Sequence, residues 1–161
     1  MNRPLAPAAI PWGRRLPGYL LRPIGILPGG MTQRSFVVLC NRIFATALAA
    51  GEFDFLDGKV LCVEVRDAGI LLRVGGQGRR LVVPDAQRRA DVRIGGDAYE
   101  FLLLVSRRED PDTLFFQRRL RIEGDTELGL HVKNFLDAWE PPAGVRALQR
   151  LAAAALERHS P

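Results

Sequence analysis

The fold class is decided by one stretch, which reads Arg118-Arg119-Leu120-Arg121-Ile122-Glu123-Gly124-Asp125-Thr126-Glu127-Leu128. Its first half alternates apolar and charged residues, which is the pattern of a half-buried strand. Gly124 allows a left-handed turn, and Asp125 or Thr126 can cap a new helix. From Leu128 onward, apolar residues recur at helical spacing. The stretch therefore predicts a strand, a glycine turn and a helix in one unit, although many α+β proteins contain such a junction.

A longer run around this junction resembles a known family. The run is Asp110-Pro111-Asp112-Thr113-Leu114-Phe115-Phe116-Gln117-Arg118-Arg119-Leu120, continuing from Ile122 to Asn134. It is similar to the C-terminal half of the sterol carrier protein type 2 family, and most similar to the bacterial branch that contains accessory factors of ubiquinone biosynthesis. A second similar stretch spans Gly51 to Gly58 and resembles the segment between the family's first helix and first strand.

The resemblance covers about residues 30–138 and implies both a fold and a role. The implied fold is α+β, with a five-stranded, mostly antiparallel sheet covered on one face by helices that enclose an apolar lipid tunnel. The implied role is that of a lipid-binding accessory to hydroxylases of oxygen-independent ubiquinone biosynthesis, rather than that of a catalyst. Its ligand would be an isoprenoid quinone precursor or a phospholipid, and no cofactor is implied.

The chain divides into three segments. At 161 residues it is long enough for one domain with a sizeable core. Residues 1–30 form a proline-rich, apolar and basic N-terminal segment, and residues 31–140 form the lipid-binding domain. Residues 141–161 add an amphipathic, basic helix to that domain. Docking of this helix on its own domain is the default, and a partner or a bilayer is the alternative.

The N-terminal segment holds more than half of the eleven prolines, which excludes a long regular helix there. Aromatic, aliphatic and arginine residues are interleaved in it, a mixture suited to a membrane interface. The expected membrane contacts are Trp12, Arg14, Arg15, Tyr19, Leu20, Leu21 and Arg22. The alternative is an arm that packs its apolar residues on the surface of the domain.

Periodicity predicts the elements of the domain. Residues 31–50 form an amphipathic helix, with Gln33 and Asn41 among the polar residues that point away from the apolar stripe. Alternating stretches predict strands at residues 61–65, 70–74, 81–83, 90–94 and 119–123, which together have one apolar face and one wet face. The run from Gly75 to Gly78 supplies a tight turn. Asp97 with Glu100 predicts a capping box at the start of another helix.

The charge and the reactive residues limit the functions that the chain can have. A net charge of +5 comes almost wholly from scattered arginines, so either an anionic membrane or a compositional bias explains it. The only histidines, His131 and His159, give neither a metal cluster nor a nucleophile–base pair, so catalysis and metal binding are not expected. Cys40 and Cys62 lie in apolar runs and indicate buried, reduced thiols in a cytoplasmic protein. The chain has no recognised nucleic-acid-binding motif and no aromatic residues interleaved with the strand arginines, so nucleic-acid binding is not expected.

The expected lipid site is an apolar pocket between the sheet and the helices. Its predicted lining is Phe36, Leu102, Val105, Phe115, Phe116, Leu128, Val132 and Phe135. A headgroup would need a polar contact at the mouth, for which Arg119 or Arg121 is suited. The location expected for such a carrier is the cytoplasm, with peripheral contact at the inner membrane face. The alternative function is a non-enzymatic scaffold with a solid core.

Overall fold

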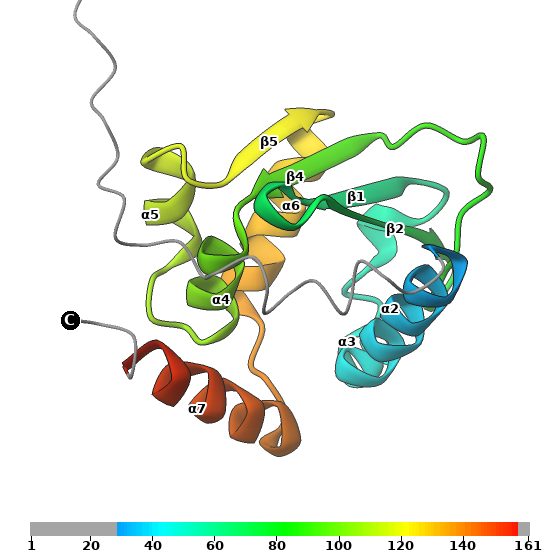
Figure 1. Cartoon of the computed structure of the whole chain (residues 1–161). Coiled ribbons are helices and arrows are strands. Elements are labelled where there is room, and N and C mark those ends of the chain that lie inside the picture. The colour runs from blue at the N-terminus through cyan, green and yellow to red at the C-terminus, as the bar shows by residue number, and fades with distance from the viewer. Residues whose placement is uncertain (1–28, 158–161) are drawn as a thin grey trace, which may run out of the picture.

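The computed structural model describes residues 29–157, and its strands form a single sheet (Figure 1). The strands are β1 (Val60–Val65), β2 (Ile70–Gln77), β3 (Arg80–Val82), β4 (Val92–Gly96) and β5 (Arg121–Gly124), in the spatial order β3-β2-β1-β4-β5. β1 and β4 run parallel, and the other three neighbouring pairs are antiparallel. The predicted five-stranded, mostly antiparallel sheet is therefore confirmed.

The helices are α2 (Gly29–Ile43), α3 (Ala45–Ala50), α4 (Ala98–Val105), α5 (Pro111–Phe116), α6 (Thr126–Ala138) and α7 (Ala143–Glu157). Two short 3₁₀ turns, η3 (Asp54–Leu56) and η4 (Arg66–Ala68), precede β1 and β2. The helix expected over residues 31–50 is interrupted at Phe44, whose φ of −100° and ψ of 15° depart from α-helical values. No helix between residues 29 and 157 is both long and apolar enough to cross a bilayer.

One face of the sheet is apolar, and helices pack against it. The strand register places Val63 beside Leu72 on one side and beside Ile94 on the other. α6 approaches this face so closely that a Cβ on Gly129 would lie 2.3 Å from Ile122 Cγ2. This close approach leaves no room for any larger residue at position 129.

The helices divide the core into two clusters. The first joins α2, α3 and α6 to the sheet, and its buried members are Val37, Cys40, Leu48, Leu56, Val74, Leu81, Val92 and Leu128. The second joins α4 and α5 to the start of β5, and its buried members are Leu103, Leu114 and Leu120. The apolar face of the sheet therefore has a densely packed region at each end, with a strip between the two that belongs to neither.

The opposite face of the sheet is polar, as the alternation predicted. Arg73 and Arg93 lie on either side of Cys62 in the register, and Arg93 Nη1 forms an ion pair with Glu64 Oε2 at 3.3 Å. The loop after β3 crosses part of this face, where Arg73 Nη1 donates to Ala86 O at 3.1 Å. Cys62 is buried even though it lies on the polar side of the sheet.

The junction after β5 has the structure that its sequence predicted. Gly124 has a φ of +95°, and a Cβ there would lie 2.4 Å from Asp91 O. The carboxylate of Asp125 accepts a hydrogen bond from Leu128 N at 3.0 Å and caps α6. Asp110 caps α5 in the same way, with Thr113 N donating at 2.8 Å. Each cap involves only residues close in sequence, so local chemistry is sufficient to form it.

Two local predictions were wrong. Asp97 does not cap α4 with its side chain, and Glu100 turns away to pair with Arg119. The carboxylate of Asp67 on η4 accepts from Ala98 N at 2.9 Å instead. The run from Gly75 to Gly78 is not all turn either, because β2 continues to Gln77. Only glycine fits at position 76 of this strand, because a Cβ there would lie 2.4 Å from the Leu56 carbonyl oxygen.

Gln33 and Asn41 were expected to point away from the core, but they bind the edge of the sheet. Asn41 Oδ1 accepts from Leu81 N at 3.0 Å, while its Nδ2 donates to Leu81 O at 2.8 Å. Gln33 makes the same pair of contacts with the backbone of Arg73, where Arg73 N donates to Oε1 at 2.8 Å. Each carboxamide thus imitates the next strand of the sheet. We call Gln33 and Asn41 the edge clamp, because together they hold α2 along β2 and β3.

Candidate lipid-binding site

The structure places the eight predicted lipid-lining residues in three settings. Phe36, Leu128, Val132 and Phe135 lie on α2 and α6, where Leu128 and Val132 are buried and the two rings are half-buried. Leu102 and Phe115 are half-buried against the second core cluster. Val105 and Phe116 are 52% and 91% exposed and line no interior space. The prediction therefore collected residues from both core clusters and two residues from the surface.

The strip between the clusters consists of Val63, Val65, Ile70 and Leu72, and we call it the central strip. The register sets Val63 opposite Leu72 and Val65 opposite Ile70 on the apolar face. All four side chains are half-buried, and none is a member of either cluster. None was predicted to line the site, although their alternation had assigned them to the apolar face. The signal that could have identified them was already present in the two strands.

A group of aromatic rings closes the core beside α6, and the sequence identified only one member of it as a site residue. Phe135 lies 4.4 Å from Phe53 and 5.6 Å from Phe44, measured between ring centroids. Trp139 lies 4.7 Å from Phe44, and Phe55 lies 5.8 Å from Phe53. The rings come from α6, the segment after it, η3, the residue before η3 and the break between α2 and α3. Their tilted and edge-on contacts stabilise this end of the domain.

Arg119, one of the two headgroup candidates, is engaged inside the protein. Its Nε lies 3.2 Å from Glu100 Oε1, and its Nη1 contacts the carboxylate of Glu109. The Arg119 side chain is only 18% exposed, so it ties α4 and the following loop to the start of β5. Arg121 is exposed and lines an open hollow with Phe115, Arg118, Leu120, Ile122 and Glu123. Of the two candidates, only Arg121 is available to a ligand.

Most of the region described above matches a known protein family. A family model described as the SCP-2 sterol transfer family matches residues 39–137. The chain belongs to this family. The SCP-2 match contains the second core cluster, the central strip and every buried member of the first cluster except Val37.

Curated relatives and one solved structure agree with the SCP-2 assignment. The ubiquinone biosynthesis accessory factor UbiT of Escherichia coli strain K12 is 40% identical over 135 residues, which cover 84% of this chain and 77% of UbiT. UbiT of the O157:H7 strain gives the same values. A solved structure titled UbiJ-SCP2 ubiquinone synthesis protein matches with a TM-score of 0.55 at 21% identity, covering 67% of this chain and 90% of that one. The match to the UbiJ-SCP2 structure shows the fold alone.

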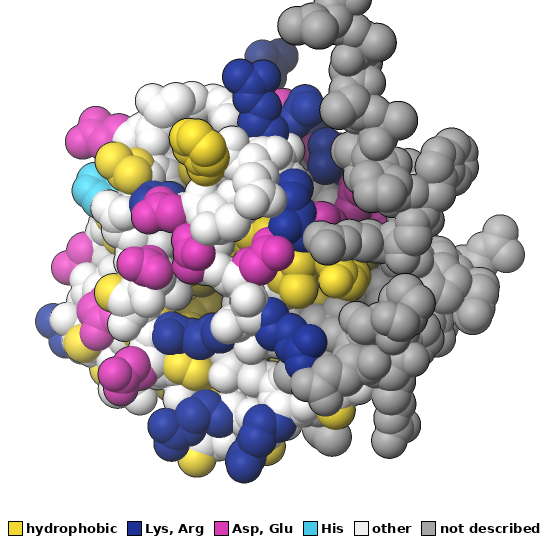
Figure 2. Space-filling view, turned by 90° about the vertical axis from the view of Figure 1, so that its left-hand side faces the viewer, with side chains coloured by type: hydrophobic (Ala, Val, Ile, Leu, Met, Phe, Trp, Pro, Cys, Tyr) yellow, Lys and Arg dark blue, Asp and Glu magenta, His cyan; other side chains and the backbone are white. Residues whose placement is uncertain are grey.

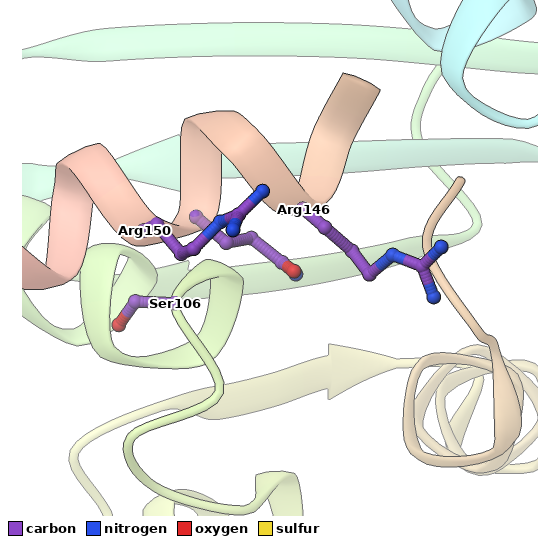
Figure 3. Close-up of a pocket in the computed structure, with 4 residues that line it drawn as sticks. Ser106, Arg146 and Arg150 are labelled. Carbon is purple, nitrogen blue, oxygen red and sulfur yellow. The ribbon is translucent and has the colours of Figure 1, made fainter. Parts of the chain in front are cut away.

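Two hollows among the described residues are open at the surface. One is the hollow beside Arg121, and the other lies between α4 and α7, where Ser106, Arg146, Gln149 and Arg150 line it (Figure 3). Charged side chains contribute to both, and neither is the enclosed apolar tunnel that the resemblance implies. A lipid site in the core of this SCP-2 domain therefore stays a prediction, as do the membrane contacts at residues 12–22, which lie outside the described residues.

The two thiols of the SCP-2 domain are buried and protonated. Burial raises the pKa of Cys40 to about 12. Burial also raises the pKa of Cys62, against the opposing effect of the Arg93 guanidinium. His131 is exposed on α6 and stacks on Phe55 at 5.8 Å. Within residues 29–157, no three His, Cys, Asp or Glu side chains are grouped as metal ligands.

Proposed function

We propose that this SCP-2 family member is a lipid-binding accessory factor of ubiquinone biosynthesis. It would hold an isoprenoid quinone intermediate or a membrane lipid and present it to hydroxylases that act without oxygen. The 40% identity to UbiT over most of both chains supports the pathway. The role is non-catalytic, because holding and presenting a lipid requires apolar surface rather than reactive groups.

The observation that carries this proposal is the central strip. Four aliphatic side chains lie side by side on the apolar face of the sheet, yet none belongs to either core cluster. A hydrocarbon tail on this strip would remove the exposed parts of these side chains from water. The gain is about 25 cal/mol for each Å² of apolar surface buried, so a long tail is held without any specific polar contact.

The walls of this site would come from the helices on either side. Phe36 packs against the first cluster and Leu102 against the second, so the two side chains would bound the strip from α2 and from α4. α2 and α4 contribute to different clusters, and we expect these two helices to move apart over the strip. The helices would move apart to admit a hydrocarbon tail and would then close over it.

A basic surface would bring the domain to the membrane that contains its ligand. Residues 12–22 provide the aromatic and basic contacts predicted for the N-terminal segment. Each arginine near an anionic leaflet contributes about 1 kcal/mol, and this attraction falls within a Debye length. Flotation with vesicles that contain anionic phospholipid should therefore exceed flotation with neutral vesicles and should fall with added salt.

The decisive experiment compares two adjacent leucines on β2. Leu72 lies on the central strip, whereas Leu71 is 54% exposed on the opposite face. An amide in an apolar site costs about 1–3 kcal/mol, so Leu72→Gln should reduce the lipid that co-purifies about tenfold. Leu71→Gln, the matched control, should retain it. The readout is mass spectrometry of lipids extracted from the two purified and equally folded variants.

Two outcomes would contradict the proposal. Lipid-free extracts from the wild-type protein, repeated after expression without oxygen, would indicate a scaffold with a solid core. Equal loss of lipid in Leu71→Gln and Leu72→Gln would show that the bound lipid does not lie on the central strip.

A further inference from the structure

β5 is an edge strand whose outward backbone groups can be identified from the register. Asp125 N donates to Asp91 O at 2.8 Å, one step beyond the pairing of Gly124 with Val92. Bonded and non-bonded pairs alternate along an antiparallel ladder, so Glu123 and Arg121 bond to β4 while Ile122 does not. The N–H and C=O of Ile122 therefore point away from the sheet.

The neighbouring residues agree with this assignment. Leu120, two residues before Ile122, has its N–H on the same outer side and donates to Leu114 O at 3.1 Å. Among residues 29–157, no strand pairs with the outer side of β5. An edge with free backbone groups is a template for pairing with another chain.

The surface beside the β5 edge carries both apolar and charged side chains. The open hollow along it is lined by Phe115, Leu120 and Ile122 together with charged residues. Phe116, at the end of α5, is 91% exposed, the largest value among the exposed large hydrophobic side chains described. Figure 2 faces the side of the molecule that carries α5 and shows hydrophobic side chains among acidic and basic ones. A nearly fully exposed phenylalanine beside an open strand edge indicates an interaction surface.

We propose that the edge of β5 pairs with β5 of a second copy of this chain. In an antiparallel, two-fold arrangement centred on Ile122, the two Ile122 residues exchange N–H and C=O hydrogen bonds. This register places Arg121 of each copy directly opposite Glu123 of the other, on the polar face of the sheet. The strand Arg121-Ile122-Glu123 is thus complementary to itself, which is the requirement for an isologous interface.

The same arrangement brings together the segments that flank the strand. The start of β5 in one copy lies beside its end in the other, so residues 116–118 approach the first turn of α6 of the second copy. Arg118 and Glu127 are both exposed and would face each other there. Phe116 would lose its exposure at the same contact. These flanking contacts are needed, because a four-residue strand alone buries far less than the usual total of about 1,600 Å².

Short edge strands that carry charges also occur where proteins prevent edge pairing. On such a protective edge, the charges need not match under a two-fold rotation. The opposition of Arg121 to Glu123 and the exposure of Phe116 favour pairing with a second copy. This dimer does not depend on the bound lipid, so its test is independent of the proposed function.

The test is a charge reversal measured by sedimentation equilibrium of the full chain from about 1 to 200 μM, a range that covers weak dimers. The wild type should show a monomer–dimer equilibrium. Arg121→Glu and Glu123→Arg each place like charges opposite one another at two symmetric positions, and each should weaken the dimer about tenfold. The double variant, Arg121→Glu with Glu123→Arg, restores opposite charges and should regain most of the affinity. Arg80→Glu, on the other edge strand, is the matched control and should change nothing.

Several results would overturn this assignment. A wild type that is monomeric over the whole range excludes the dimer. If both single variants leave the dimer unchanged, or if the double variant fails to restore it, the dimer forms through another surface. Phe116→Ser gives an independent check, because it removes apolar contact without changing charge or the backbone. An unchanged dimer in Phe116→Ser would exclude the flanking contact and with it the two-fold register.

Discussion

The edge clamp gives the most direct test of how α2 is held on the sheet. In Asn41→Ala, Leu81 N loses its acceptor at 3.0 Å and Leu81 O loses its donor at 2.8 Å. Val37 O loses only an additional donor at 2.9 Å, because it also accepts from the helix backbone. A hydrogen bond contributes about 1 kcal/mol net, and a buried backbone group left without a partner costs about 1–3 kcal/mol. Leu81 is 5% exposed, so water has little access to this site. We expect the free energy of unfolding to fall by about 2–4 kcal/mol.

The measurement is urea denaturation followed by far-UV circular dichroism at neutral pH. Asn41→Asp keeps the acceptor for Leu81 N but sets a carboxylate against two carbonyl oxygens, so it should also destabilise. Arg42→Ala is the control, because it changes the next residue on the exposed side of the same helix and should stay within about 0.5 kcal/mol of the wild type. If Asn41→Ala is as stable as Arg42→Ala, the edge clamp contributes no stability and the reasoning is refuted.

Three further predictions concern close packing, thiol burial and helix capping. Gly129→Ala should lower the free energy of unfolding by about 1–3 kcal/mol in urea titrations, since its Cβ would lie 2.3 Å from Ile122 Cγ2. Gly144→Ala is the control: its Cβ meets no atom within 4 Å, so the free energy of unfolding should rise by about 0.5 kcal/mol. Cys40 and Cys62 should resist iodoacetamide at pH 8 until denaturant is added, because burial keeps both thiols protonated, and rapid native labelling would contradict this. The hydrogen bond from Leu128 N lowers the pKa of Asp125 below its usual 3.8, so its stabilisation is present above that pH and is lost as the pH falls further. The difference in urea midpoint between wild type and Asp125→Asn should therefore shrink below pH 4, and a constant difference would refute the assignment.

Part of the lipid-site prediction followed from the sequence, and part of it did not. Helical spacing correctly assigned Leu128 and Val132 to the buried side of α6. Spacing could not show that Phe116 is exposed while Phe115 packs inward, because adjacent helical residues differ in direction by about 100° and only the surroundings select one. The central strip was missed for a related reason. Alternation gives the face of a strand, but it does not say which residues of that face pack into a core cluster.

The sequence alone determined what depends on residues close together along the chain. The strand–turn–helix junction at Gly124, the caps at Asp110 and Asp125, and the alternating faces of the strands each involve residues a few positions apart. Tertiary structure decided the parallel pairing of β1 with β4, the capping of α4 by Asp67, and the edge clamp, whose residues lie 40 positions from their backbone partners. A free carboxamide or carboxylate has many possible partners at such distances, and packing of the apolar face selects the one that the chain brings within hydrogen-bonding reach.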